Sequence, residues 1–144
     1  MSATHIGDRD VDELIRLATE ATEFAYAPYS RFRVGAALMT GGGQFYSGAN
    51  VENRSYPLSI CAERAAVTKA VNERRADLEI IAIAVAESKG GPCAPCGGCR
   101  QVISEFARAG AILIYKDGRG IFKRVAIEEA LPEALAFLTE IPPR

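Results

Sequence analysis

The sequence predicts an α/β fold in which helices pack against one sheet. Apolar residues recur at helical spacing in three segments, residues 10–26, 61–75 and 100–109, and short apolar runs typical of buried strands lie between and after them. The order of elements is a leading helix followed by β-β-α-β-α-β-β, which is the order of an α/β sandwich. With 144 residues, 49% of them hydrophobic, we expect a single domain over residues 1–144.

The first third of the chain predicts one helix and a strand pair. Residues 10–26 carry the helical recurrence, and Asp8 or Asp10 is placed to cap its start. Residues 33–39 form an apolar run typical of a buried strand. Three glycines at 41–43 then predict a turn, and residues 44–49 return as the partner strand.

The rest of the chain predicts two more helices, three strands and a short C-terminal helical region. Residues 61–75 have helical spacing, and residues 79–86 read as a fully buried strand. Residues 90–92, Gly-Gly-Pro, break regular structure, and a helix is predicted after them at 100–109. Strands at 111–115 and 120–125 follow around a turn, and a final helical region is broken by Pro132.

Charge and hydropathy exclude two classes of partner. Seventeen Lys and Arg against eighteen Asp and Glu leave a formal charge of −1, so the chain lacks the basic field that nucleic acid requires. The longest apolar run, residues 80–86, is far shorter than the roughly 20 residues that span a bilayer. The first eight residues contain no secretory signal. We therefore expect a cytoplasmic protein with a small-molecule partner, no nucleic acid and no membrane.

The four cysteines predict a metal site. Cys93, Cys96 and Cys99 fall within seven residues, and Cys61 lies upstream at the start of another predicted helix. A reducing cytosol disfavours disulfides, whereas helix N-termini favour the thiolate form that binds metal. Three thiolates with an open fourth position are typical of zinc. The only histidine, His5, lies in the N-terminal tail, so the site is built from cysteines.

Spacing alone leaves other uses of these cysteines open. Cys93 and Cys96 satisfy the same Cys-x-x-Cys pattern as Cys96 and Cys99. A closed site in which Cys93 supplies a fourth ligand would make the metal purely structural. A redox dithiol needs no distant third cysteine. An iron–sulfur cluster would require the Cys-x-x-Cys-x-x-Cys run to continue as Cys-x-x-x-Cys-Pro, and this sequence does not.

Three segments together resemble the small homotetrameric zinc-dependent cytidine deaminases. They are residues 26–38 (YAPYSRFRVGAAL), residues 50–66, which contain Cys61-Ala62-Glu63, and residues 95–102 (PCGGCRQV). The likeness runs from about residue 26 to about residue 132, with the motifs in the family's order. It implies a three-layer α/β/α sandwich around a five-stranded mixed sheet, and hydrolysis of cytidine and 2′-deoxycytidine to uridine and 2′-deoxyuridine with release of ammonia.

The resemblance assigns roles around one Zn²⁺ per chain. Cys61, Cys96 and Cys99 match the metal ligands, the last two because Arg100-Gln101-Val102 follows them as in the family. Glu63 matches the acid that takes a proton from the activated water and passes it to the ring and then to the departing amine. Arg64 matches an arginine that offsets the charge of the thiolates.

The resemblance also assigns substrate contacts. Asn50 and Glu52 match the pair that binds the ribose, and Phe32 matches the aromatic residue that packs on the pyrimidine. Tyr56 matches a tyrosine near the sugar in a neighbouring subunit's site, which implies a homotetramer with shared active sites. Where the family has a phenylalanine that stacks on the base, this chain has Leu135, and Phe137 is the nearest ring.

That replacement keeps other functions under consideration. One is a deaminase of a related aminated nucleoside or nucleoside antibiotic, and another is an editor of cytosine in polynucleotides, which the near-neutral charge disfavours. A third, from a different class, is a zinc-stabilised binding module without catalysis. Glu63 beside three cysteines favours an enzyme over such a module.

Overall fold

A five-stranded mixed sheet forms the middle layer of the protein in the computed structural model, which describes residues 5–134. The strands lie in the order β2-β1-β3-β4-β5; β3 and β4 are parallel, and the other neighbours are antiparallel. Their bounds are β1 Val34–Thr40, β2 Phe45–Ala49, β3 Ile80–Glu87, β4 Ala107–Lys116 and β5 Phe122–Ala126.

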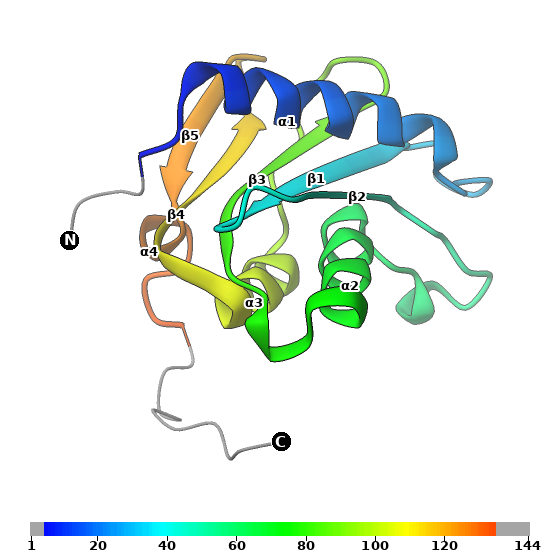
Figure 1. The fold of residues 1–144 in the computed structure, drawn as a ribbon. Helices are drawn as coiled ribbons and strands as arrows, with labels where there is room; N and C mark the ends of the chain where they lie inside the picture. Colours follow the sequence, from blue (N-terminus) through cyan, green and yellow to red (C-terminus); the bar gives the residue numbers. More distant parts are fainter. Residues whose placement is uncertain (1–4, 135–144) are drawn as a thin grey trace.

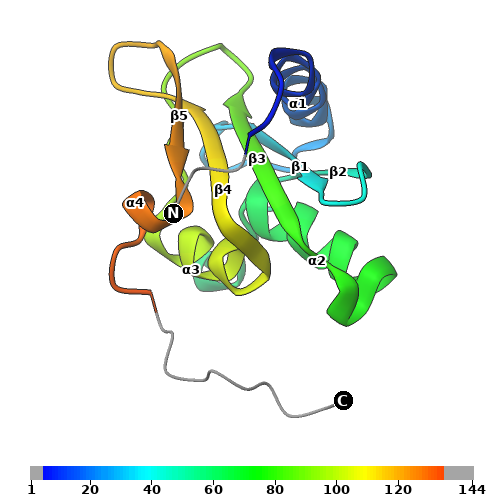
Figure 2. The ribbon, with the colours of Figure 1, turned by 60° about the vertical axis from the view of Figure 1, so that its left-hand side comes forward.

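Helices cover both faces of this sheet (Figure 1). Helix α1 (Asp8–Ala21) packs on one face, and α2 (Ala62–Arg74) and α3 (Gly97–Phe106) pack on the other. The short α4 (Ile127–Ala130) lies beside β4 and β5, as the turned view in Figure 2 shows. Each face of the sheet has its own buried cluster of apolar side chains. The predicted three-layer α/β/α sandwich is confirmed.

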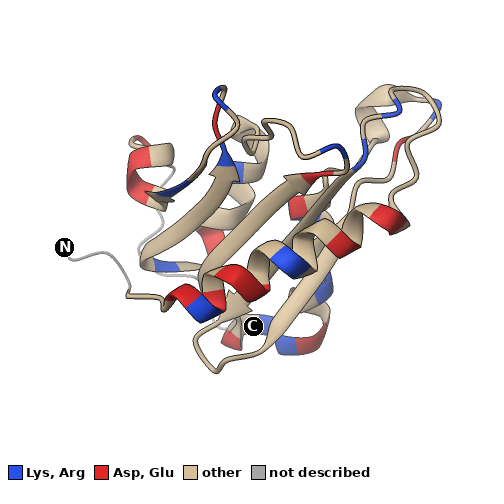
Figure 3. Cartoon of the chain, turned by 90° about the horizontal axis from the view of Figure 1, so that it is seen from above, with Lys and Arg blue, Asp and Glu red and all other residues tan. Residues whose placement is uncertain are grey.

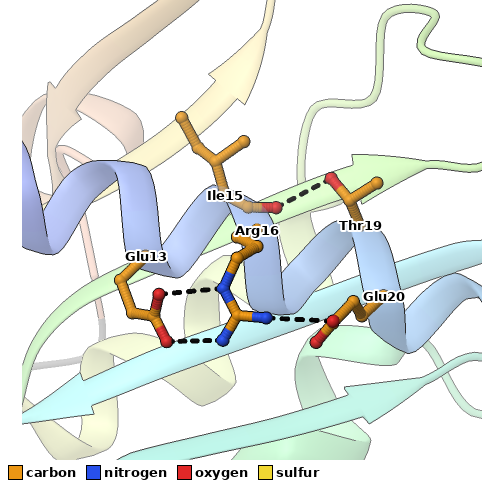
Figure 4. A network of polar contacts seen from close by, with 5 residues as sticks. All are labelled: Glu13, Ile15, Arg16, Thr19 and Glu20. Atoms are coloured by element: carbon orange, nitrogen blue, oxygen red, sulfur yellow. Dashed lines mark hydrogen bonds and ion pairs between the residues drawn. The ribbon is translucent and has the colours of Figure 1, made fainter.

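Helix α1 is amphipathic. Its buried side chains are Val11, Leu14, Ala18 and Ala21. On its outer face Arg16 bridges Glu13 and Glu20 at 2.7 and 2.9 Å, an exposed network that contributes little to stability (Figure 4).

The predicted bounds of this first helix were wrong at both ends. The helix starts at Asp8, two residues early, with Gly7 in the capping position, so neither Asp8 nor Asp10 caps it. It ends at Ala21 and tightens into a 3₁₀ turn over Thr22–Phe24. Tyr26 lies beyond the helix, where its backbone forms an isolated β-bridge with Val51.

Two glycines let helices approach the sheet through their backbones. A Cβ atom at Gly35 of β1 would lie 2.0 Å from the carbonyl oxygen of Ala18 in α1. A Cβ atom at Gly48 of β2 would lie 2.5 Å from the backbone nitrogen of Ala66 in α2. Since neither neighbour is the end of a flexible side chain, these contacts fix how close both helices lie to the sheet.

Replacing Gly48 by Ala is therefore expected to lower the free energy of unfolding by about 1–3 kcal/mol, because α2 must move away from β2. Urea unfolding followed by circular dichroism measures this change. The control is Gly118→Ala in the turn after β4, where nothing lies within 4 Å of the new methyl group; its effect should stay within about 0.5 kcal/mol. Equal effects at both positions would show that the α2 contact is not tight.

The third predicted helix runs too far. Residues 107–109 continue the helical spacing of α3, but in the structure they begin β4, where Ala107 pairs with Ile80 of β3. Pairing with the central strand outweighs the local helical pattern. The predicted strand at 111–115 accordingly starts four residues too late, whereas the other four predicted strands lie within two residues of those observed, and α4 ends before Pro132 as expected. Leu135 and Phe137 lie outside the described residues.

Charged residues are concentrated on the helices and loops, while most of the sheet is uncharged (Figure 3). Strand β1 has no charged residue, and β3 has one, its last residue Glu87, which is buried. In the part of the chain that the structure describes, no helix combines the length and hydropathy needed to cross a membrane.

Candidate metal centre

Three cysteine thiols converge where α2 and α3 begin. Cys61 immediately precedes α2, Cys96 immediately precedes α3, and Cys99 lies in the first turn of α3. Their Sγ atoms all lie within 4.8 Å of one another. Cys99 is buried, Cys61 is half-buried and Cys96 is exposed. The two helix N-termini thus place their thiols around one point.

The donor set fits zinc. Zn–S bonds of about 2.3 Å in tetrahedral geometry place sulfur atoms roughly 3.8 Å apart, so only a small contraction of this cluster is needed. Three thiolates leave one of four positions for a non-protein ligand. Within residues 5–134 this is the only group of three or more Cys, His, Asp or Glu side chains close enough to hold a metal ion, and Cys93 is not part of it.

The thiols differ in acidity because of their surroundings. Hydrogen bonding from the Cys99 thiol, and then from Arg64, lowers the pKa of Cys61. The guanidinium of Arg64 also donates to the carbonyl oxygen of Ser59 at 3.0 Å, which fixes it beside the cluster. Burial raises the pKa of Cys93 to about 12, and hydrogen bonding with Cys61 and burial also raise the pKa of Cys99, so position and not acidity separates Cys93 from the cluster.

Glu63 is buried next to the cluster. It is the second residue of α2 and is only 4% exposed. Burial, and then the negative charge of Cys61, raises the pKa of its carboxyl group. Its place in the cavity wall lets this carboxyl group exchange a proton with a bound ligand.

A cavity of about 270 Å³ opens beside the thiols. It brings together seven residues that the sequence singled out: Phe32, Asn50, Glu52, Tyr56, Cys61, Glu63 and Cys96. Cys96 completes the metal side of its wall. The cavity wall also contains Cys93, which the sequence offered as an alternative ligand, and five residues that the sequence did not identify, which are Val34, Ser59, Ile60, Ala62 and Ala94. Cys93 thus belongs to the cavity wall, whereas Arg64 and Cys99 lie behind it.

Asn50 is held by the segment that carries Phe32. Its Oδ1 atom accepts a hydrogen bond from the backbone N–H of Val34 at 2.9 Å, and its Nδ2 atom donates to the carbonyl oxygen of Phe32 at 2.8 Å. Both ends of the amide therefore have partners, and their arrangement sets the shape of the cavity rim. One donor and one lone pair of the amide remain for a ligand.

Glu52 binds the backbone of the same segment, residues 29–34, at its N-terminal end. Its Oε1 atom accepts hydrogen bonds from the backbone N–H groups of Tyr29 and Ser30 at 3.0 and 3.1 Å. Hydrogen bonding to Ser30 lowers the pKa of this carboxyl group, so Glu52 presents a carboxylate to the cavity. Tyr56 also lines the cavity, with the centroid of its ring 6.0 Å from that of Tyr29 and 60% of the residue exposed.

Comparison with known proteins identifies close relatives of this chain. Residues 8–116 match the family described as the cytidine and deoxycytidylate deaminase zinc-binding region. The cytidine deaminase of Halalkalibacterium halodurans is 45% identical over 125 residues, which cover 87% of this chain and 93% of the relative. That of Sporosarcina psychrophila is 40% identical over 127 residues, covering 88% and 92%.

A solved structure has the same fold. The crystal structure of cytidine deaminase from Burkholderia pseudomallei superposes with a TM-score of 0.76 at 42% sequence identity. The superposition covers 86% of this chain and 98% of that one. The similarity therefore extends over nearly the whole length of these relatives.

Proposed function

This chain belongs to the cytidine and deoxycytidylate deaminase family and is a zinc-dependent cytidine deaminase, and from this premise we propose that it acts on both free nucleosides, cytidine and 2′-deoxycytidine. The products are uridine and 2′-deoxyuridine, with release of ammonia. The observation that carries the proposal is the buried Glu63 beside three clustered thiols in the wall of one cavity. A near-neutral nucleoside suits a chain with a formal charge of −1.

Glu63 moves the protons of the reaction. It takes one proton from the water that attacks C4 of the ring and delivers it to N3. It then passes the second proton of that water to the departing amine, so that water and cytidine give uridine and ammonia. Zinc held by Cys61, Cys96 and Cys99 supplies a Lewis acid that lowers the pKa of a coordinated water.

Arg64 balances the charge of the thiolates. Three thiolates around a dication carry a formal charge of −1, and the guanidinium faces Cys61 while Ser59 fixes its position. The N-termini of α2 and α3 add positive potential at the same point.

Replacing Arg64 by Ala is therefore expected to leave the fold intact but to speed the loss of zinc to a chelator about tenfold, as removal of a supporting group typically does. Metal content after dialysis measures this loss. The matched control is Lys69→Ala, which removes an exposed cation from the same helix. Zinc retention equal to that of the native protein would contradict the role of Arg64.

The nucleoside is held by the rim of the cavity. Phe32 packs on the pyrimidine ring, and the free oxygen of Glu52 with the remaining donor of Asn50 binds the sugar hydroxyls. The clamped rim segment supports this assignment, because it fixes all three groups before a ligand arrives.

The protein forms a homotetramer in which Tyr56 contributes to a neighbouring subunit's site. Exposed apolar side chains gather in two segments, residues 24–32 and 51–60, and three of them, Phe32, Tyr56 and Ile60, line the cavity; so many are unusual for a surface that stays in water. They are Phe24, Tyr26, Tyr29, Phe32, Val51, Tyr56, Leu58 and Ile60. Sedimentation equilibrium tests this state: four chains per particle support it, and a monomer contradicts it.

The reaction serves pyrimidine salvage in the cytoplasm. Turnover and metal content measured on one sample test the proposal. Ultraviolet spectra should change with cytidine and deoxycytidine and stay constant with a short single-stranded DNA, and zinc should be present at one ion per chain. Turnover of the polynucleotide, or full zinc occupancy with no turnover of either nucleoside, would overturn it.

A further inference from the structure

Glu87 is a buried carboxylate that has no part in the mechanism above. It ends β3, the central strand, and is 6% exposed. None of the ion pairs found among residues 5–134 involves it. A buried carboxylate is costly unless hydrogen bonds replace its water. The hydrogen bonds that Glu87 accepts therefore indicate what it does in the fold.

The carboxylate holds the first turn of the loop that follows β3. Its Oε1 atom accepts hydrogen bonds from the backbone N–H of Lys89 and, at 3.3 Å, from that of Gly91. Between them Gly90 adopts a φ of +76°, which favours glycine, and its N–H donates to the Glu87 carbonyl oxygen at 3.0 Å. One side-chain oxygen and one backbone oxygen thus fix three successive residues.

This loop leads directly to the metal centre. Cys93, Ala94 and Cys96 follow within a few residues, and all three line the cavity. Further along, the N–H of Cys93 donates to the carbonyl oxygen of Lys116 at 3.2 Å. At the far end the Nε atom of Arg100 donates to the carbonyl oxygen of Pro95 at 2.9 Å. At the near end Glu87 is the anchor for the backbone N–H groups, while the Nζ atom of Lys116 donates to the carbonyl oxygen of Gly90 at 2.8 Å.

We propose that Glu87 is a positioning residue for the metal centre. By fixing the turn at residues 88–91 it sets the path of residues 92–96, and with it the placement of Cys96 and of the cavity wall at Cys93. This role rests on the proposed zinc ligands. It belongs to a residue that itself contacts neither the zinc ion nor the nucleoside. The property required of Glu87 is a hydrogen-bond acceptor at Oε1.

The test uses four variants of the full chain. Glu87→Gln keeps an acceptor oxygen, Glu87→Asp withdraws it by one methylene, and Glu87→Leu removes it. The control is Asp117→Leu. Asp117 accepts backbone N–H bonds from Arg119 and Ile121, the same i+2 and i+4 pattern, in a loop that does not line the cavity.

Zinc release to a chelator, well below the unfolding temperature, is measured together with kcat and KM for cytidine. Glu87→Leu is expected to release zinc about tenfold faster and to raise KM, while Glu87→Gln stays within about twofold of native and Glu87→Asp falls between them. Asp117→Leu should lower the unfolding temperature without changing zinc release. If Glu87→Leu does not fold, the comparison of Asp with Gln carries the test.

Two results overturn the proposal. Zinc release from Glu87→Leu or Glu87→Asp that matches the native rate shows that the loop needs no such anchor. A Glu87→Gln variant as impaired as Glu87→Leu shows that the acceptor is not the property that matters. Native protein without zinc or turnover would instead overturn the proposed function itself, so the two failures are distinguishable.

Discussion

Glu63→Gln is expected to lower kcat for cytidine by about 10²- to 10⁴-fold while zinc stays at one ion per chain. The amide has the size and shape of the buried carboxyl group, so the start of α2 and the neighbouring thiol of Cys61 should keep their places. It cannot carry the protons that the reaction moves from water to N3 and to the amine.

The measurement is steady-state turnover with metal analysis of the same preparation. Glu105→Gln, on the exposed face of α3, is the matched control and should keep native activity. Unchanged turnover in Glu63→Gln would remove Glu63 from the mechanism. Loss of zinc in that variant would mean that the carboxyl group supports the metal centre more than the chemistry.

Cys99→Ala is expected to abolish zinc binding and turnover together, whereas Cys93→Ala should retain one zinc per chain. Cys99 is fully buried within the three-thiol cluster, and its loss leaves two ligands. Removing a mere supporting group of a metal typically costs about 10- to 100-fold in affinity, so loss of a ligand should exceed this. Cys93 lies in the cavity wall, outside the cluster.

Metal analysis after gel filtration distinguishes the two overlapping Cys-x-x-Cys pairs. The reverse result, with zinc kept by Cys99→Ala and lost by Cys93→Ala, would assign the site to Cys93 and Cys96. Loss of zinc from both variants would indicate four ligands and a closed, structural metal.

Most of the fold follows from local patterns in the sequence. The helices α1, α2 and α3 and the buried strand β3 were each predicted from their apolar residues, with the bounds of α2 and β3 correct to one residue and those of α1 and α3 to within five. The errors lie where a distant segment decides the backbone conformation. Residues 107–109 continue a helical pattern but pair with β3, and Tyr26 leaves α1 to bridge Val51.

The site was predictable where chemistry restricts the residue type. Only thiols could supply the metal ligands in this chain, so Cys61, Cys96 and Cys99 stand out once the motif spacing is recognised. Asn50 and Glu52 were singled out through the resemblance alone, and no local pattern could foretell that both also bind the backbone of residues 29–34.

Glu87 gave no signal in the sequence. A glutamate that follows a run of apolar residues usually marks the point where a strand meets solvent. Here it is buried, because the loop after β3 folds back over it. Such a role depends on the path of the loop and is visible only in three dimensions.

Cys61 precedes β3 in the sequence, whereas Cys96 and Cys99 follow it, and this order has a consequence for the stability of the chain. Cys61 and Cys96 are about 35 residues apart, separated by α2, the central strand and a loop, and they meet only after that strand has entered the sheet. Because the unfolded chain has no preformed site, zinc binds the folded state alone, and its binding free energy adds to the free energy of unfolding. Removal of the metal should therefore loosen the joint between α2 and α3 first.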